Sequence, residues 1–228
     1  MTELKRFETR SDLAVRLAQD TAFALSARLQ RADKAMLAVS GGTTPVLFLE
    51  ALSRVELDWS RIVVTLVDER WVPEESPRSN AALVRRHLLT GNAASASFIP
   101  LYNGAPTPEA GKQAQAALLA SQPLPLAAAI LGMGEDGHTA SFFPDGDHLA
   151  AALDLQTGQL LETMEAPYAG EPRITLTLPV LVQADFLALH LEGERKREVL
   201  ARACEAGPDF EMPVRAVLAR KPRIYWCP

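Results

Sequence analysis

Three short apolar runs, each ended by a polar cluster, place the strongest constraint on how this 228-residue chain can fold. The runs are Met36–Val39, Ile62–Val67 and Ala127–Leu131. Ile62–Val67 is rich in β-branched residues and carries no charge, which is typical of a strand buried on both faces. Strands of this kind belong to parallel sheets whose faces are covered by helices. The pattern therefore predicts an α/β protein with a mainly parallel sheet flanked by helices.

The rest of the chain alternates between helical patterns and strand signals. Ser11 is predicted to cap a helix that runs to about Gln30, because Leu17, Thr21 and Leu25 fall on one helical face. The other predicted helices are Val46–Arg54, Asn80–Leu89, Pro108–Ser121 and Glu194–Glu205. The other predicted strands are Phe98–Leu101, Arg173–Leu178, Phe186–Leu191, Val214–Leu218 and Arg223–Trp226. Neither an internal repeat nor a long linker divides the chain, so we expect a single domain over residues 1–228.

The polar clusters after the three buried runs are Ser40–Thr44, Asp68–Arg70 and Gly132–His138. In open parallel sheets, ligands bind beyond the carboxyl ends of the strands. Because all three clusters follow predicted buried strands, we expect them to meet at one edge of the sheet. The sequence therefore predicts a binding or catalytic site at that edge.

The first cluster joins a strand to a helix. Gly41 and Gly42 allow a tight turn that approaches a ligand closely, and the free N–H groups at a helix start favour an anion. The hydroxyls of Ser40 and Thr43 are candidate additional donors. The cluster matches neither a Walker A loop nor a GxGxxG fingerprint, so it does not indicate nucleotide binding. The alternative is a simple strand–helix turn with a helix cap.

The second cluster is the charged triplet Asp68-Glu69-Arg70. A solvated loop is the ordinary interpretation of such a triplet, since most charges are exposed. Its position at the end of a buried strand favours a place in the ligand crevice instead. There Arg70 is a candidate to stabilise a developing oxyanion, and Asp68 is a candidate to orient that arginine or to accept from a substrate hydroxyl.

The third cluster opens the stretch GMGEDGHTASFFP, residues 132–144, which is the most informative part of the sequence. Its glycines allow a loop that presents His138, whose side chain suits proton transfer near neutral pH. Asp136 is close enough in sequence to orient the imidazole, but spacing alone leaves open whether Glu135 or Asp136 contacts it. We assign no site role to the remaining histidines, which are His87 in a helix, His148 in an exposed loop and His190 in a strand.

Two cationic residues complete the candidate site. Arg173 opens a predicted strand, and Lys196 lies near the start of the Glu194–Glu205 helix. Taken alone, each is interpreted as a surface charge. A phosphate dianion needs cations as well as backbone donors, and these two residues are candidates to supply them.

Composition narrows the classes of function. A net charge of −5 argues against a dedicated nucleic-acid binder. The two cysteines have neither CxxC spacing nor a histidine at ligand spacing, which argues against a zinc site and against a disulfide framework. The first ten residues carry charges where a signal peptide is apolar, and the apolar runs are too short to span a bilayer. We therefore expect a cytoplasmic protein that binds neither nucleic acid nor membrane.

Taken together, the motifs resemble the 6-phosphogluconolactonase family. The stretches that carry the resemblance are LAVSGGTTP (37–45), VDERWVP (67–73) with Ser79-Asn80, LGMGEDGHTASFFP (131–144), Arg173 in PRITLTLPVL and Lys196 in EGERKREVL. The match runs in the same order from about residue 36 to the C-terminus. Relatives of that family include the glucosamine-6-phosphate deaminase/isomerases, so the resemblance implies their Rossmann-like fold.

The resemblance also implies an activity, which is hydrolysis of the small sugar-phosphate lactone 6-phosphoglucono-δ-lactone to 6-phosphogluconate in the oxidative pentose phosphate pathway. No metal or organic cofactor is expected. By position, His138 is the general base, and Arg70 with Asp68 lines the reacting end. Carried over in the same way, the expected phosphate-binding residues are Ser40, Gly41, Gly42, Thr43, Arg173 and Lys196.

Two other functions and one question of assembly stay open at this point. Deaminases of the related group have a glutamate before the closing proline of the histidine loop, where this chain has Phe143, which cannot transfer a proton. A sugar-phosphate sensor would keep the pocket without catalysis, but the chain shows no helix-turn-helix extension. The sequence is compatible with a monomer and with a homodimer.

Overall fold

The computed structural model describes residues 4–167 and 169–228 and contains a large parallel sheet, so the predicted α/β class is confirmed. Residues 1–3, part of the charged N-terminal stretch, lie outside the described residues. All neighbouring strands of the large sheet run parallel. In spatial order the strands are β1 (Leu4–Arg6), β10 (Arg223–Cys227), β9 (Phe186–Glu192), β6 (Ala128–Leu131), β2 (Ala35–Val39), β3 (Ile62–Leu66) and β5 (Ser97–Ile99).

The three adjacent interior strands β6, β2 and β3 correspond to the three apolar runs of the sequence. Every residue of these strands is buried, as expected for strands covered on both faces. Val39 of β2 is in register with Leu66 of β3 and with Ile130 of β6. The three strands therefore end at the same level, and the polar clusters that follow them begin side by side.

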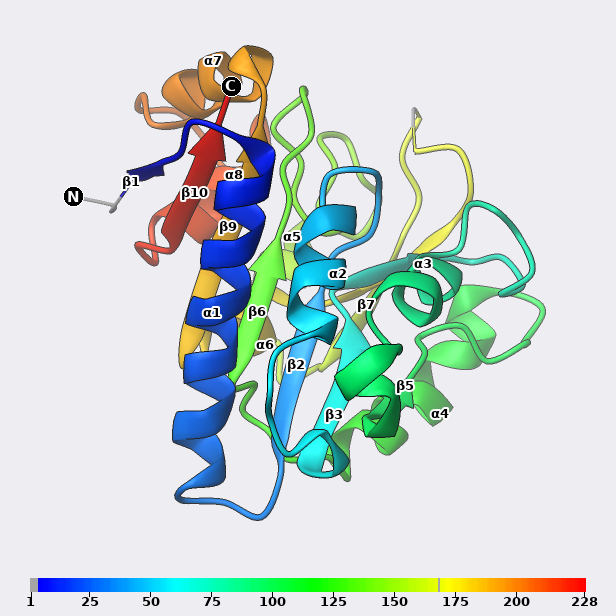
Figure 1. The fold of residues 1–228 in the computed structure, drawn as a ribbon. Helices are drawn as coiled ribbons and strands as arrows, with labels where there is room; N and C mark the ends of the chain where they lie inside the picture. Colours follow the sequence, from blue (N-terminus) through cyan, green and yellow to red (C-terminus); the bar gives the residue numbers. More distant parts are fainter. Residues whose placement is uncertain (1–3, 168) are drawn as a thin grey trace.

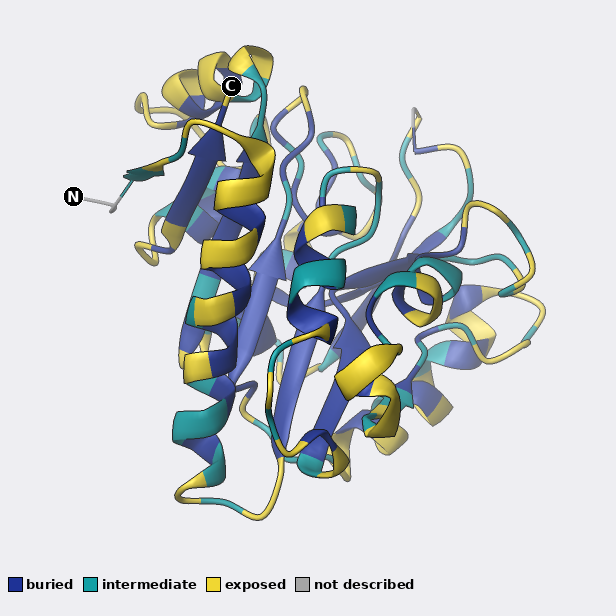
Figure 2. Ribbon diagram, in the orientation of Figure 1, coloured by how far each residue is buried: buried dark blue, intermediate teal, exposed yellow. Residues whose placement is uncertain are grey.

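Helices pack against the two sheets. They are α1 (Arg10–Leu29), α2 (Val46–Ser53), α3 (Asn80–His87), α4 (Pro108–Ala120), α5 (Leu149–Leu153), α6 (Leu178–Val182), α7 (Glu194–Ala203) and α8 (Val214–Leu218), with 3₁₀ turns at Trp59–Arg61 and Gly91–Ser95. In Figure 1, α1 and α2 pack side by side across the front of the sheet. Figure 2 shows that α1 has a buried inner face and an exposed outer face. No helix within the described ranges is both long enough and apolar enough to cross a membrane.

A second, antiparallel sheet was not expected from the sequence. It contains β4 (Asp68–Arg70), β8 (Arg173–Leu176) and β7 (Leu161–Met164), in that spatial order. Val67 links the two sheets, because its N–H donates to Val39 of β2 at 2.9 Å while its carbonyl accepts from Leu176 at 2.9 Å. The charged triplet is therefore a strand of its own rather than a solvated loop, and Asp68 and Glu69 within it are buried.

Two predicted local features were wrong. Thr9, not Ser11, caps α1, since its hydroxyl oxygen accepts from the N–H of Asp12 at 3.1 Å and Ser11 lies inside the first turn. Val214–Leu218 forms helix α8 and not a strand. A five-residue segment such as VRAVL is too short for a decisive period, and here the chain enters it from Pro213, which favours a helix start.

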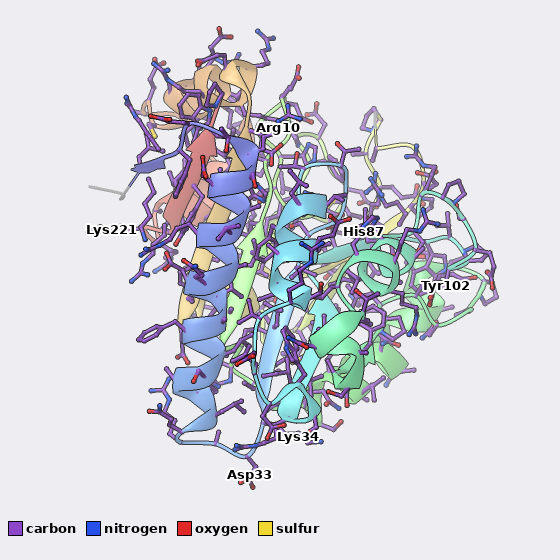
Figure 3. All side chains as sticks on the ribbon, viewed as in Figure 1. Arg10, Asp33, Lys34, His87, Tyr102 and Lys221 are labelled. Atoms are coloured by element: carbon purple, nitrogen blue, oxygen red, sulfur yellow. The ribbon has the colours of Figure 1, made fainter. Side chains whose placement is uncertain are left out.

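The ends of the sheet can be followed in Figure 3. Asp33 and Lys34, which precede β2, are labelled at the lower end of the molecule, and Arg10, at the start of α1, is labelled at the upper end. The strand arrows of β6 and β10 point to the upper end in Figure 1. The loops that follow the carboxyl ends of the strands, and with them the candidate site, therefore lie at the upper edge.

Candidate active site

The three polar clusters line one cavity of about 620 Å³ at the carboxyl edge of the large sheet, as the sequence predicted. Every candidate residue named from the sequence contributes to its wall: Ser40, Gly41, Gly42, Thr43, Asp68, Arg70, Asp136, His138, Arg173 and Lys196. The cavity is large enough for a sugar phosphate, and its wall is rich in cations and polar groups.

His138 and Asp136 form a hydrogen-bonded pair within the loop after β6. The imidazole Nδ1 lies 2.6 Å from Asp136 Oδ1, and the backbone N–H of His138 donates to the same oxygen at 3.0 Å. Burial of the Asp136 carboxylate acts to raise its pKa, but the hydrogen bonds and charge of His138 outweigh burial and hold the pKa below its ordinary value. Glu135 instead faces Arg195 at 3.6 Å in solvent. The question left open by the sequence is thus resolved in favour of Asp136.

The glycines of this loop make room for the pair. A Cβ atom on Gly134 would lie 2.1 Å from His138 Nδ1 and 2.4 Å from Asp136 Oδ1, so no larger residue fits there. The N–H of Gly134 also donates to the carbonyl of His138 at 2.7 Å. The loop is supported from outside by α8, because the N–H of Val214 donates to the carbonyl of Gly137 at 2.9 Å. Val214–Leu218, predicted as a strand, therefore forms a helix that supports the loop carrying His138.

The loop Ser40–Thr44 joins β2 to α2 beside the histidine loop. The hydroxyl of Ser40 donates to the carbonyl of Ile130 at 3.0 Å and accepts from the N–H of Gly132 at 3.2 Å. Ser40 therefore ties two strand ends together, and its proton is already used within the protein. Gly42 has a φ of +91°, and a Cβ atom on Gly41 would overlap the side chain of Asn80. Only glycine fits this turn against α3.

Arg70 extends from β4 into the cavity wall. One of its terminal nitrogens donates to the carbonyl of Arg78 at 2.7 Å and to Oδ1 of Asn80 at 2.9 Å. Its Nε is buried and has no hydrogen-bond partner among the described residues. A buried donor of this kind costs free energy when it is left unpaired, so a bound anion or substrate oxygen would satisfy it.

Asp68 and Arg173 face each other across the paired strands β4 and β8, with Asp68 Oδ2 3.8 Å from an Arg173 terminal nitrogen. The hydroxyl of Ser141 donates to the same carboxylate oxygen at 2.6 Å. Both the carboxylate and the guanidinium are almost fully buried. Burial lowers the pKa of Arg173, and the positive charges of Arg70 and Arg78 lower it further, while Asp68 and Glu171 raise it.

Lys196 reaches the site from the first turn of α7. Its ammonium donates to the carbonyl of Met133 at 2.6 Å, within the loop Gly132–His138 that carries the proposed base. Burial lowers its pKa, and the carboxylates of Glu135 and Asp136 offset only part of this effect. A phosphate dianion at this position would stabilise the charged form of the lysine.

The wall also contains residues that the sequence analysis did not select. Phe143 lies with its ring centroid 4.5 Å from that of His138 and has the Arg173 guanidinium 5.3 Å from its ring. Arg78 and Asn80 hold Arg70, and Ser141 holds Asp68. His190, given no role from the sequence, is buried and belongs to the wall through β9. Ser141 could have been found from the sequence, since it lies only three residues after the candidate base. Contacts between residues far apart in the chain could not.

Comparisons with known proteins show which family and which solved structures the chain is similar to. The family described as "Glucosamine-6-phosphate isomerases/6-phosphogluconolactonase" matches residues 8–226. A 6-phosphogluconolactonase of Rhizobium meliloti (strain 1021) is 51% identical over 225 residues, which cover 97% of each chain. The crystal structure of a 6-phosphogluconolactonase from Shewanella baltica OS155 superimposes with a TM-score of 0.97 at 40% identity, covering 100% of this chain and 98% of that chain.

The fold is shared more widely. A monomeric glucosamine-6-phosphate deaminase has a TM-score of 0.79 at 16% identity, covering 99% of this chain and 96% of that chain, and this likeness concerns the fold alone. The family of the chain is shown by the 51% identical relative and by the family match over residues 8–226. The chain belongs to the family of glucosamine-6-phosphate isomerases and 6-phosphogluconolactonases.

Proposed function

We propose that this protein hydrolyses 6-phosphoglucono-δ-lactone to 6-phosphogluconate, a step of the oxidative pentose phosphate pathway. The proposal is supported by relatives named 6-phosphogluconolactonase that are up to 51% identical over nearly the whole chain. The family match over residues 8–226 supports a single lactonase-like domain. Membership of this metabolic family also supports a cytoplasmic location and a small-molecule substrate.

The single observation that carries the mechanism is the hydrogen bond between Asp136 and His138. With Asp136 ionised, Nδ1 of His138 donates to the carboxylate, which leaves Nε2 as the basic nitrogen. His138 removes a proton from water as the water oxygen bonds to the lactone carbonyl carbon. Asp136 stabilises the imidazolium that forms. A positioned base of this kind contributes about 10²–10⁴-fold in rate.

The negative charge that develops on the carbonyl oxygen needs a donor. Arg70 is the proposed donor, because its buried Nε in the cavity wall has no hydrogen-bond partner among the described residues. The N–H groups of Gly132 and Gly134 already donate to Ser40 and to the carbonyl of His138. When the tetrahedral intermediate collapses, the bond from the carbonyl carbon to the ring oxygen breaks. The imidazolium of His138 then returns its proton to that oxygen, which leaves a carboxylic acid and a free hydroxyl. Asp68, held by Ser141, lines the same end of the cavity.

The phosphate is proposed to bind at the cationic part of the wall. Arg173 and Lys196 supply positive charge, and the turn from Gly41 to Thr43 supplies backbone N–H groups. The hydroxyl of Ser40 serves this turn indirectly, by fixing it to the end of β6. Replacing Arg173 or Lys196 by alanine is expected to weaken substrate binding more than turnover.

Phe143 favours hydrolysis over the deamination carried out by other members of this fold. It occupies the position before Pro144 and lies against the imidazole of His138, so no carboxylate is available there for a proton relay. A passive sugar-phosphate sensor is the other candidate. The arrangement of Asp136 with His138 favours catalysis, because a binding protein has no need of an oriented base.

The experiment that tests the proposal measures both reactions on the purified chain. Freshly generated 6-phosphogluconolactone is hydrolysed in an assay coupled to oxidation of 6-phosphogluconate, and the spontaneous rate is subtracted. Ammonia release from glucosamine 6-phosphate is measured in parallel. We expect rapid lactone hydrolysis and no ammonia. Ammonia release would assign the chain to deamination, and binding without acceleration would assign it to a sensor.

A further inference from the structure

Two arginines of the candidate site lie directly opposite each other on neighbouring strands, so their like charges need stabilising contacts from other residues. Arg70 of β4 is in register with Arg173 of β8 in the antiparallel pair. Like charges at such opposed positions repel each other and destabilise the pairing. Asp68 faces Arg173 from one side. Other groups must hold the two guanidinium groups at a fixed separation.

Each arginine is held by the backbone of a different loop. Arg70 donates to the carbonyl of Arg78 at 2.7 Å, in the loop before α3. Arg173 donates from Nε to the carbonyl of Glu171 at 3.3 Å, in the loop before β8. The two loops are also joined by the N–H of Trp71, which donates to the carbonyl of Pro172 at 2.7 Å.

The side chains of the two holding residues then pair with each other. Arg78 Nη2 donates to Glu171 Oε2 at 2.8 Å, and the Nε of Arg78 contacts the other carboxylate oxygen. This two-point geometry is the strong form of an arginine–carboxylate pair. The four residues Arg70, Arg78, Glu171 and Arg173 thus form a closed ring of contacts, and Arg78 lines the cavity.

An exposed ion pair of this kind contributes little to stability, because solvent screens it. The Arg78 side chain is 54% exposed and that of Glu171 26% exposed. The effect of the ion pair should therefore appear in the placement of the two loops and only weakly in the free energy of unfolding. A change in loop placement would alter the separation of Arg70 from Arg173, and a displacement of about 1 Å in a site costs up to about 10²-fold.

We propose that the Arg78–Glu171 ion pair is a positioning clasp that sets the separation between the guanidinium groups of Arg173 and Arg70 in the cavity wall. The proposal rests on the lactonase function proposed above, since that function assigns Arg173 to the phosphate and Arg70 to the reacting carbonyl. Arg78 acts through Arg70 and Glu171 acts through Arg173, without a contact of their own to the reacting atoms.

The test is a double-mutant cycle on the full chain. Arg78→Glu, Glu171→Arg and the double exchange Arg78→Glu/Glu171→Arg are compared for the KM and kcat of the lactone and for the Kd of 6-phosphogluconate by calorimetry. Glu171→Ala removes the pair without adding charge. Each single variant is expected to raise KM and Kd by about three- to thirtyfold, and the exchange is expected to recover most of that loss. Thermal midpoints should stay near that of the wild type.

Arg85→Ala is the matched control. Arg85 is 50% exposed and pairs with Glu74 of the same loop that carries Arg78, but it lies outside the cavity wall. It should leave KM and Kd unchanged. The clasp is overturned if the double exchange binds 6-phosphogluconate no better than the weaker-binding single variant, or if Arg85→Ala has the same effect as those variants. It is also overturned if Glu171→Ala binds 6-phosphogluconate more tightly than the wild type, because Arg78 itself would then contact the phosphate. If the wild type binds 6-phosphogluconate without hydrolysing the lactone, the proposed function is wrong. The Kd values of the double-mutant cycle then still test the clasp.

Discussion

Asp136 Oδ1 accepts two hydrogen bonds from one residue, the ring N–H of His138 at 2.6 Å and its backbone N–H at 3.0 Å. The carboxylate therefore fixes both the backbone and the imidazole of the proposed base. Asp136→Asn removes the charge that stabilises the imidazolium. We expect kcat to fall by at least about tenfold and by no more than the 10²–10⁴-fold that the base as a whole contributes, while KM changes little.

The control for that variant is Glu135→Gln, the neighbouring carboxylate. Its side chain is 63% exposed and faces Arg195, so kcat should stay within about twofold of the wild type. Equal losses in the two variants, measured by steady-state kinetics, would show that charge near the loop matters and that the specific contact does not.

Gly134 offers a second test of the same pair. Gly134→Ala places a methyl group where the atoms of His138 and Asp136 now lie. We expect Gly134→Ala to lose at least about 10²-fold in kcat. Circular dichroism should show the variant folded. An active Gly134→Ala variant would mean that the loop accommodates a displaced imidazole.

The lowered pKa of Lys196 predicts how phosphate binding depends on pH. Burial favours the neutral amine, so the ammonium loses its proton at a lower pH than an ordinary lysine does. Because only the charged form attracts the phosphate dianion, the affinity for 6-phosphogluconate should fall as the pH rises through that lowered pKa. The ligand's own groups have already ionised at neutral pH and do not interfere.

Lys196→Arg tests this assignment by calorimetry between about pH 8 and pH 10.5. The guanidinium keeps its charge throughout this range, so the affinity of the variant should be nearly flat. An unchanged alkaline loss of affinity in Lys196→Arg would assign that loss to another group.

Glu69 is predicted to stabilise the fold rather than to take part in the reaction. Its two carboxylate oxygens accept from the N–H groups of Arg70, Asn80 and Ala81, each at 2.8 Å, and from the hydroxyl of Ser79 at 3.1 Å. Glu69→Gln turns an amide donor toward these donors, and denaturant unfolding should show a loss of about 1–3 kcal/mol. The exposed Glu75→Gln in the same segment should change the unfolding free energy by less than about 0.5 kcal/mol.

The large sheet could be predicted from the sequence because its central strands are uninterrupted apolar runs, such as Ile62–Val67. The small antiparallel sheet could not, since Asp68–Arg70 is three charged residues whose strand state exists only through pairing with β8, about a hundred residues later. Val214–Leu218 was misassigned for a related reason. Its apolar run fits either structure, and the contact with Gly137 shows only in the folded chain.

The candidate site follows the same rule. The candidate residues of the three polar clusters could be named from their positions after buried strands, and Arg173 and Lys196 from their charge and the family resemblance; all of these candidates line the cavity. The contacts between side chains could not be predicted, because Ser141 meets Asp68 and Arg78 meets Glu171 across long stretches of chain. Spacing identifies which residues reach the edge of the sheet, whereas tertiary packing decides which of them touch.

The role of His138 is tested most directly by comparing wild type and His138→Ala in the coupled assay with freshly generated 6-phosphogluconolactone, against the spontaneous background. We expect rapid hydrolysis by the wild type and a fall of about 10²–10⁴-fold in the rate of the variant, with 6-phosphogluconate still bound. A variant that hydrolyses the lactone as fast as the wild type would contradict the assignment of His138 as the base.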